Sequence, residues 1–185
     1  MDTKKFQVSY PWDTSGYTPR TIFELGMNDD GFLMHITVYE SDPRREQREH
    51  QKPVHWDSCV EWFVNFCPEC CDRYFNFEMN ANGAVHVAFR KNRSEYRLLT
   101  HDEIDMLDVK TIIGRDVWEV TYAVPFSLIQ KYIPDYQFQE GMRINANFYK
   151  CGDLMEFPHY GVWSEIPVET PDFHRPEYFG IIELL

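Results

Sequence analysis

The segment YFNFEMNANGAVHVAF, residues 74–89, carries the clearest local signal in the chain. Apolar and polar residues alternate on both sides of Asn82-Gly83, with the two-residue period of a β-strand. An Asn-Gly pair accepts the positive φ angles of a type I′ turn, whose twist suits two antiparallel strands. We therefore predict a β-hairpin formed by residues 74–79 and 84–89, with a type I′ turn between them.

The same period recurs on both sides of this hairpin. It is present in residues 32–38 (FLMHITV), 118–124 (WEVTYAV) and 144–148 (INANF), and in each of them one row of apolar side chains would face a core. Helical signal is sparse, and only residues 125–132 are predicted to form a short helix, with a proline at the start and Pro134 beyond the end. Many strands separated by turn residues predict an all-β fold, an immunoglobulin-like or jelly-roll-type antiparallel β-sandwich with one short helix.

Length and composition fit one folded domain over residues 1–185. Hydrophobic residues make up 43% of the chain and aromatic residues 16%, which is enough apolar material for a core. Two stretches, residues 40–55 and 152–175, are rich in proline and mixed in polarity, and we expect them to be long loops. Neither is low in complexity, so neither is expected to be an interdomain linker.

The charge balance excludes two classes of partner. Eighteen Lys and Arg residues stand against 30 Asp and Glu residues, giving a net charge of -12 that would repel phosphate backbones and anionic lipids. We therefore expect no nucleic acid and no membrane partner. Residues 1–20 lack the apolar run of a signal peptide, so the chain as written is expected in the cytoplasm, or outside the cell if a leader has been trimmed.

The five cysteines are odd in number and irregular in spacing, which favours reduced thiols over a disulfide scaffold; they are Cys59, Cys67, Cys70, Cys71 and Cys151. The C-x-x-C spacing at Cys67 and Cys70, followed by Cys71, also matches zinc ligands. Such a site would need a further ligand, for which Cys59, His50 and His55 are candidates. The alternative is a loop tip with reduced thiols.

Three patches, read in order, carry a family resemblance. The first is WDSCVEWF at 56–63, the second is VWEVTYAVPF at 117–126 followed by Gly141 and RINAN at 143–147, and the third is VWS at 162–164 followed by DFHRPEYFG at 172–180. In order and spacing, from about Ile22 to the C-terminus, the chain resembles carbohydrate-binding module family 9. The resemblance implies a β-sandwich that clamps a sugar ring between two aromatic rings and bonds its hydroxyls with a carboxylate and amides.

Mapped onto this sequence, the resemblance places the first aromatic at Trp56 or at His55 beside it, the carboxylate at Glu61 and the second aromatic at Phe173. The chain departs from the family pattern at two places. It has Phe75 or Asn76 where characterised modules have an arginine, and it has Phe173 where they have a second tryptophan.

The physical chemistry of sugars points to the same residue types. A pyranose has an apolar C–H face that a flat ring can cover and a rim of hydroxyls that charged and amide groups can bond. Four further residues are therefore sugar-binding candidates, namely Asn76, Asn147, Trp163 and His174. An amide on a strand face is also an ordinary solvent-facing residue, and Phe173 could instead close the C-terminal strand by packing.

The function expected from these observations is non-catalytic binding of an oligosaccharide or polysaccharide, associated with carbohydrate catabolism and with a glycoside hydrolase as partner. The resemblance also makes structural calcium a candidate, with Asp29, Asp30, Asp42 and Asp57 in or near loops.

Two alternatives stay open. The first is a glycan-active hydrolase or lyase that uses Glu61 as acid or base to cleave O-glycosyl bonds. Its obvious second carboxylate is Asp57, which would lie about 13 Å away on an extended strand, beyond the separations that glycosidases use. The second alternative is a haem-binding or protein-binding sandwich.

Overall fold

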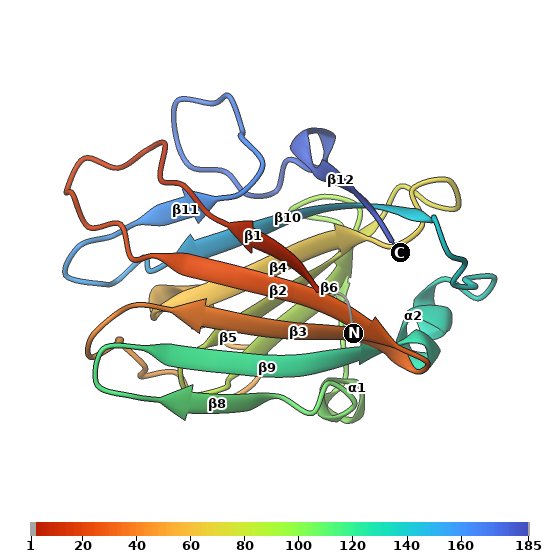
Figure 1. The fold of residues 1–185 in the computed structure, drawn as a ribbon, viewed down its shortest axis with the longest axis horizontal. Helices are drawn as coiled ribbons and strands as arrows, with labels where there is room; N and C mark the ends of the chain where they lie inside the picture. Colours follow the sequence, from red (N-terminus) through yellow and green to blue (C-terminus); the bar gives the residue numbers. More distant parts are fainter. Residues whose placement is uncertain (1–2, 185) are drawn as a thin grey trace.

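A computed structural model describes residues 3–184 and shows two antiparallel sheets packed face to face (Figure 1). The strands of the first sheet are β1 (Lys4–Gln7), β2 (Thr21–Asn28), β3 (Gly31–Val38), β8 (Lys110–Ile113) and β9 (Trp118–Pro125). The strands of the second sheet are β4 (Cys59–Asn65), β5 (Tyr74–Asn80), β6 (Val85–Arg90), β7 (Tyr96–Leu98), β10 (Arg143–Cys151), β11 (Tyr160–Val162) and β12 (Gly180–Glu183). The strand orders are β1-β2-β3-β9-β8 and β11-β10-β4-β5-β6-β7, with β12 also paired to β10. The predicted all-β antiparallel sandwich is confirmed.

The core lies between the two sheets and is built from the predicted alternating rows. Phe32, Met34, Ile36 and Val38 are at most 2% exposed, and the apolar rows of β9 and β10 are buried with them. From the other sheet, Trp62 on β4 stacks on its cross-strand neighbours at ring-centroid distances of 5.6 and 6.3 Å. Each such side chain contributes about 1.5–3 kcal/mol by leaving water, so this interface fixes which face of each strand points inward.

The predicted hairpin is confirmed, and the type I′ turn is wrong. Strands β5 and β6 pair in register from Tyr74 with Arg90 to Met79 with Val85. The turn spans Asn80 to Gly83, and only Gly83 has a positive φ, of 78°, because the φ of Asn82 is not positive. The side-chain oxygen of Asn80 accepts hydrogen bonds from two backbone amides of the turn, so a longer loop takes the place of a two-residue turn.

In the described part of the chain, residues 3–184, four short helical segments connect the strands: η1 (Val54–Trp56), α1 (His101–Asp105), α2 (Phe126–Tyr132) and η2 (Pro176–Tyr178). Helix α2 is the predicted one and begins directly after Pro125. Helix α1 was not predicted, although Thr100 and Glu103 form a capping box at its start.

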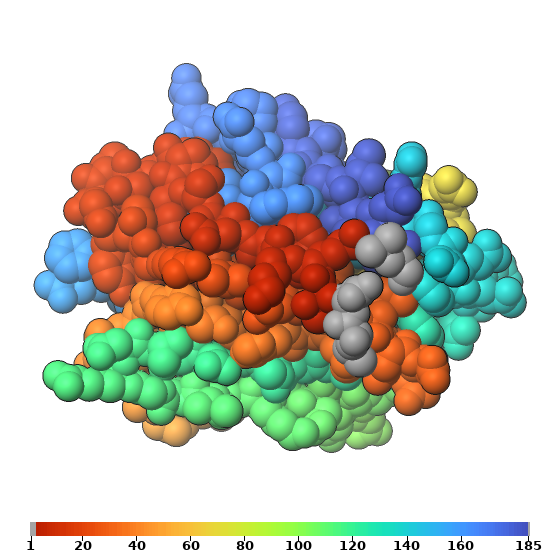
Figure 2. All heavy atoms as spheres, viewed as in Figure 1, coloured from red at the N-terminus to blue at the C-terminus, as the bar shows by residue number. Residues whose placement is uncertain are grey.

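Figure 2 shows the outer face of the first sheet. This face is formed by the red and orange N-terminal strands and by the green segment that contains β8 and β9. No helix among residues 3–184 has the length and apolar character needed to cross a bilayer.

Candidate functional site: a cleft on the outer face of the second sheet

The strand alternation that builds the core also builds a polar outer face. On β4, Val60 and Trp62 point into the core, so Cys59 and Glu61 point away from it. The register places one row of outward residues across four neighbouring strands, in the order Tyr149, Glu61, Glu78 and His86. The sheet therefore presents two glutamates side by side, flanked by an aromatic and a histidine.

A cleft of about 330 Å³ lies over this row. Its walls come from the outer face of the sheet, from η1 and from the loops around residues 93, 153 and 171–174. The residues that line it are His55, Glu61, Glu78, His86, Arg90, Arg93, Tyr96, Cys151, Asp153, Tyr160, Pro171, Phe173 and His174.

The buried side-chain amide of Asn76 positions two charged residues of the cleft, Arg90 and Glu78. The side-chain amide of Asn76 donates to Glu78 Oε1 at 2.6 Å, and its carbonyl oxygen accepts from Arg90 Nε at 2.7 Å. Arg90 is 6% exposed and also lies 3.3 Å from His86 Nε2. Because Asn76 is fully buried, it fixes both charged groups without occupying the cleft.

The acidity of Glu78 is set by its neighbours. Burial would raise the pKa of Glu78, but the contacts with His55, His86 and Asn76 outweigh burial and lower it. His55 Nδ1 lies 3.7 Å from Glu78, and this contact raises the pKa of His55. The cleft thus contains a carboxylate with a lowered pKa beside a histidine with a raised pKa.

Glu61 has a different environment on the floor of the cleft. It is 4% exposed and accepts a hydrogen bond from Cys151 Sγ at 3.1 Å. Burial, followed by the neighbouring Cys151 and Glu78, raises the pKa of Glu61 well above its ordinary value. Glu61 therefore favours the neutral acid, in contrast to Glu78.

Aromatic side chains form the opposite wall. The ring of Phe173 stacks on Tyr149 at a centroid distance of 4.1 Å with an interplanar angle of 10°, and meets Tyr160 edge-on at 6.3 Å. Phe173 itself is half-buried and lines the cleft. Next to it, His174 Nδ1 lies 2.8 Å from the hydroxyl of Tyr74. The packing of Tyr149 against one face of Phe173 gives this ring a fixed orientation.

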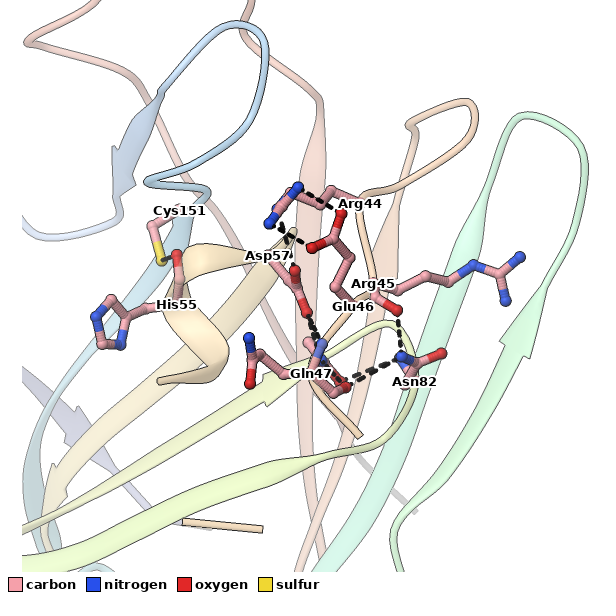
Figure 3. A network of polar contacts seen from close by, with 9 residues as sticks. Arg44, Arg45, Glu46, Gln47, His55, Asp57, Asn82 and Cys151 are labelled. Atoms are coloured by element: carbon pink, nitrogen blue, oxygen red, sulfur yellow. Dashed lines mark hydrogen bonds and ion pairs between the residues drawn. The ribbon is translucent and has the colours of Figure 1, made fainter. Parts of the chain in front are cut away.

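Asp57, which is fully buried, anchors the loop before η1 (Figure 3). Asp57 Oδ2 accepts from the amide of Gln47 at 2.7 Å and from Asn80 at 2.9 Å, and its other oxygen lies 3.3 Å from Arg44 Nε. Asn82 bonds the carbonyl oxygen of Gln47 from the hairpin side. These contacts position η1, and with it His55, at the rim of the cleft.

A second buried charge pair lies behind the floor of the cleft. Lys150 Nζ is fully buried on the inner side of β10, 3.8 Å from Glu40. Glu40 also accepts hydrogen bonds from the indole of Trp118 at 2.9 Å, from Tyr17 at 2.7 Å and from Ser58. This pair joins the two sheets and the loop that follows β3.

Four of the predicted sugar-binding residues line the cleft, namely His55, Glu61, Phe173 and His174. The predicted clamp of Trp56 and Phe173 is not assembled, because the ring of Trp56 is 41% exposed and lies outside the cleft lining. Of the two alternatives for the first aromatic, the structure brings His55 into the cleft.

The other three candidates have structural partners. Asn76 lies beneath the cleft, as described above. Asn147 is fully buried and exchanges two hydrogen bonds of 2.8 Å with the backbone of Ser164. Trp163 packs against Phe6 and Phe148 at the edge of the core. None of these three lines the cleft.

Most of the charged residues of the cleft were not predicted as site residues from the sequence. Glu78 and His86 occupy outward positions of the predicted hairpin, and Arg90 follows directly after it on the same face. The period that identified the core row therefore also identified this polar row. At Phe75 and Asn76, where the family pattern has an arginine, neither side chain lines the cleft; an arginine of the second hairpin strand, Arg90, does. No strand period could identify Arg93 and Asp153 as residues of the cleft, because both lie in loops.

The structure corrects the prediction for the cysteines. Cys67 and Cys70 form a disulfide, so the expectation of reduced thiols is wrong for this pair and neither sulfur is free to bind zinc. Cys59, Cys71 and Cys151 are free thiols. Within residues 3–184, one group of three side chains could share a metal ion, and it consists of Cys59, Glu61 and Cys151. The four aspartates considered for calcium do not belong to it, and structural calcium stays a prediction.

Comparison with known proteins agrees with this architecture. The most similar structures include a Bacteroides uniformis protein described as a carbohydrate-binding candidate, which is 27% identical with a TM-score of 0.86, covering 99% of this chain and 87% of that one. They also include a family 9 carbohydrate-binding module from Caldicellulosiruptor kristjanssonii. Its complex with cellotriose is 13% identical with a TM-score of 0.66, covering 98% and 82% of the two chains. Its complex with glucose is 14% identical with a TM-score of 0.65, covering 97% and 84%.

No curated protein matches the chain. The model of carbohydrate-binding family 9 matches residues 3–184, which is nearly the whole sequence. This agrees with the order of motifs and with the sandwich, and it is consistent with a binding module rather than an enzyme. The chain belongs to carbohydrate-binding family 9.

Proposed function

We propose that this protein binds an oligosaccharide or polysaccharide in the cleft on the outer face of the second sheet, without chemically changing it. Family membership supports binding of a sugar. The observation that carries the proposal is the pairing of a fixed, half-buried ring, Phe173, with a fixed cation and anion, Arg90 and Glu78, in one cleft. These groups match the apolar face and the hydroxyl rim of a sugar ring.

The proposed roles follow from where each group is held. Phe173 covers the C–H face of the sugar, supported from behind by Tyr149. Glu78 accepts hydrogen bonds from hydroxyls, and Arg90 donates to hydroxyl oxygens. Because Asn76 bonds both charged groups in advance, little conformational entropy is lost when the ligand binds. His55 and Glu61 complete the rim and the floor.

The size of the cleft favours a short piece of glycan over a long stretch. Its volume of about 330 Å³ is at the lower end of the range of about 300–1,000 Å³ for small-molecule sites. We further propose, from family membership alone, that the protein acts in carbohydrate catabolism beside a glycoside hydrolase. Location in the cytoplasm remains a prediction.

Titration calorimetry tests the binding proposal. Glucose, cellotriose and a panel of other neutral oligosaccharides are titrated into the wild type, into Phe173→Ala and into Phe157→Ala. Phe157 is the matched control, because it is an exposed phenylalanine in the loop before β11 and lies outside the cleft. We expect Phe173→Ala to weaken the affinity about tenfold and the control to leave it unchanged.

Two outcomes would contradict the proposal. One is the absence of heat with every saccharide at millimolar concentration. The other is release of shortened sugars by the wild type that Glu61→Gln abolishes while binding persists, which would instead support the hydrolase or lyase.

A further inference from the structure

Three potential metal ligands converge on the floor of the cleft. Cys59 and Glu61 are two residues apart on β4 and therefore share its outer face, and the register places Cys151 of β10 directly opposite Cys59. All three side chains are at most 4% exposed, and their ligand atoms lie within 4.8 Å of one another. We propose that Cys59, Glu61 and Cys151 bind a thiophilic divalent metal ion such as Zn²⁺.

The present geometry is close to what a tetrahedral ion needs. With Zn–S bonds of about 2.3 Å and Zn–O bonds of about 2.1 Å, two sulfurs lie about 3.8 Å apart and a sulfur and an oxygen about 3.6 Å apart. Cys151 Sγ and Glu61 Oε1 are 3.1 Å apart, and no pair in the group exceeds 4.8 Å. Side-chain adjustments of about an ångström would bring the three atoms into coordination, while the strands stay in register.

The charge of the cluster also favours a cation. Two thiols and a carboxyl face one another, and within residues 3–184 no lysine, arginine or histidine forms an ion pair with Glu61. Lys150 interacts with the three groups through the sheet, but its ion pair is with Glu40. In the structure a single hydrogen bond, from Cys151 to Glu61, connects the acids. A divalent ion would replace the protons of these ligands and balance the negative charge that deprotonation creates.

The ligand types select the kind of ion. Two sulfurs and one oxygen suit Zn²⁺, Cd²⁺ and Co²⁺, whereas Ca²⁺ and Mg²⁺ require six or more oxygen ligands. Three protein ligands leave a fourth position, and here the open side of the cluster faces the cleft, since Glu61 and Cys151 both line it. The cleft thus gives the ion a path of entry and leaves room for a water molecule as the fourth ligand.

Cobalt binding, followed by absorption spectroscopy, tests this proposal independently of any sugar. The full chain is reduced, stripped with a chelator and titrated with Co²⁺ in the absence of oxygen. We expect one equivalent to bind and to produce thiolate-to-cobalt charge-transfer bands together with the visible bands of a tetrahedral ion. In Cys151→Ser the charge-transfer intensity should fall by about half and the affinity at least tenfold. Glu61→Gln, which preserves shape, should weaken binding without loss of the thiolate bands.

The matched control removes the competing thiols of the loop. Cys67→Ser, Cys70→Ser and Cys71→Ser, combined in one variant, eliminate the two C-x-x-C cysteines that reduction exposes and the free thiol beside them, and this variant should bind Co²⁺ as the wild type does. In addition, Zn²⁺ should raise the Tm of the wild type and of this control by more than it raises that of Cys151→Ser. Absence of charge-transfer bands in the wild type, or their loss in the loop control with retention in Cys151→Ser, would overturn the proposal. Circular dichroism verifies that each variant is folded.

Discussion

The two faces of β5 are buried to nearly the same extent but differ in chemistry. Phe77, on the inner face, is 1% exposed, and Glu78, on the outer face, is 5% exposed. Phe77 is buried by the aromatic rings of the core, whereas Glu78 is buried by polar partners and by the loops around the cleft. Low exposure therefore does not identify the core of this protein. The partners of each side chain decide whether it stabilises the fold or forms the site.

The largest effect is expected on the inner face. Phe77→Ala removes a ring that stacks between Trp62 and Phe75, and it should lower the free energy of unfolding by about 3–5 kcal/mol. Urea denaturation followed by tryptophan fluorescence measures this change. Phe157→Ala, at an exposed phenylalanine, should change stability by less than about 0.5 kcal/mol. A loss of similar size in both variants would show that the core does not depend on this row.

Lowering the pH should reduce the stability of the protein through His174 on the outer face, and not through the aromatic core. Burial, followed by Arg90 and Arg93, lowers the pKa of His174 from 6.5 to about 4, against the opposing influence of Glu78 and Asp172. Above pH 6.5 the histidine is neutral in both states. Between pH 6.5 and about 4 the unfolded chain takes up a proton that the folded chain does not, so stability is lost as the pH falls.

This loss from His174 amounts to at most about 3.5 kcal/mol, at about 1.4 kcal/mol per pH unit. His174→Asn retains an acceptor for the hydroxyl of Tyr74 but cannot titrate. The stability difference between wild type and His174→Asn, measured in urea at pH 7, 5 and 4, should therefore shrink as the pH falls. A constant difference across this range would show that His174 is not held neutral in the folded state.

The next largest effect is expected on saccharide binding, at Arg90 on the outer face. Arg90→Gln removes the cation that Asn76 holds beside Glu78, and it should weaken saccharide binding tenfold to a hundredfold, equivalent to about 1.5–3 kcal/mol. Arg97→Gln is the matched control, since Arg97 is an exposed arginine of β7 outside the cleft. Calorimetry with the sugar that the wild type binds best measures both. Equal affinities for the two variants would place the ligand away from Arg90.

The smallest effect is expected at Trp56. Its ring is exposed and lies outside the cleft lining, so Trp56→Ala should change saccharide affinity by less than about threefold. The same calorimetric titration measures it, with Phe173→Ala as the comparison. A loss at Trp56 as large as that at Phe173 would mean that the loop containing η1 moves to form the two-ring clamp.

Much of the sandwich could be predicted because its signal is local. The alternation in residues 32–38, 118–124 and 144–148 fixed the inward rows, and Asn82-Gly83 located the hairpin, although the geometry of its turn depends on the side chain of Asn80. Helix α1 could have been found from Thr100 and Glu103, because their spacing is that of a capping box.

The site was less predictable because it depends on contacts between distant segments. Sequence cannot decide which of the adjacent His55 and Trp56 faces the cleft, since this depends on how Asp57 anchors the short η1 segment. Asn147 has the composition of a sugar ligand, but its amide is used by the backbone of Ser164. Phe173 could be identified from family resemblance, whereas its support by Tyr149 required the fold.

Lys150, which is buried in the interior, affects the electrostatics of the cleft. A sheet is one peptide layer thick, so a charge on its inner side acts through a thin region of low polarisability on groups at its outer side. The ammonium group of Lys150 interacts in this way with Cys59, Glu61 and Cys151. Replacing this hidden lysine with methionine would leave the contour of the cleft unchanged and still alter the electrostatic potential that an incoming ligand meets. The electrostatic potential of the cleft therefore depends in part on a buried residue that a ligand in the cleft cannot contact.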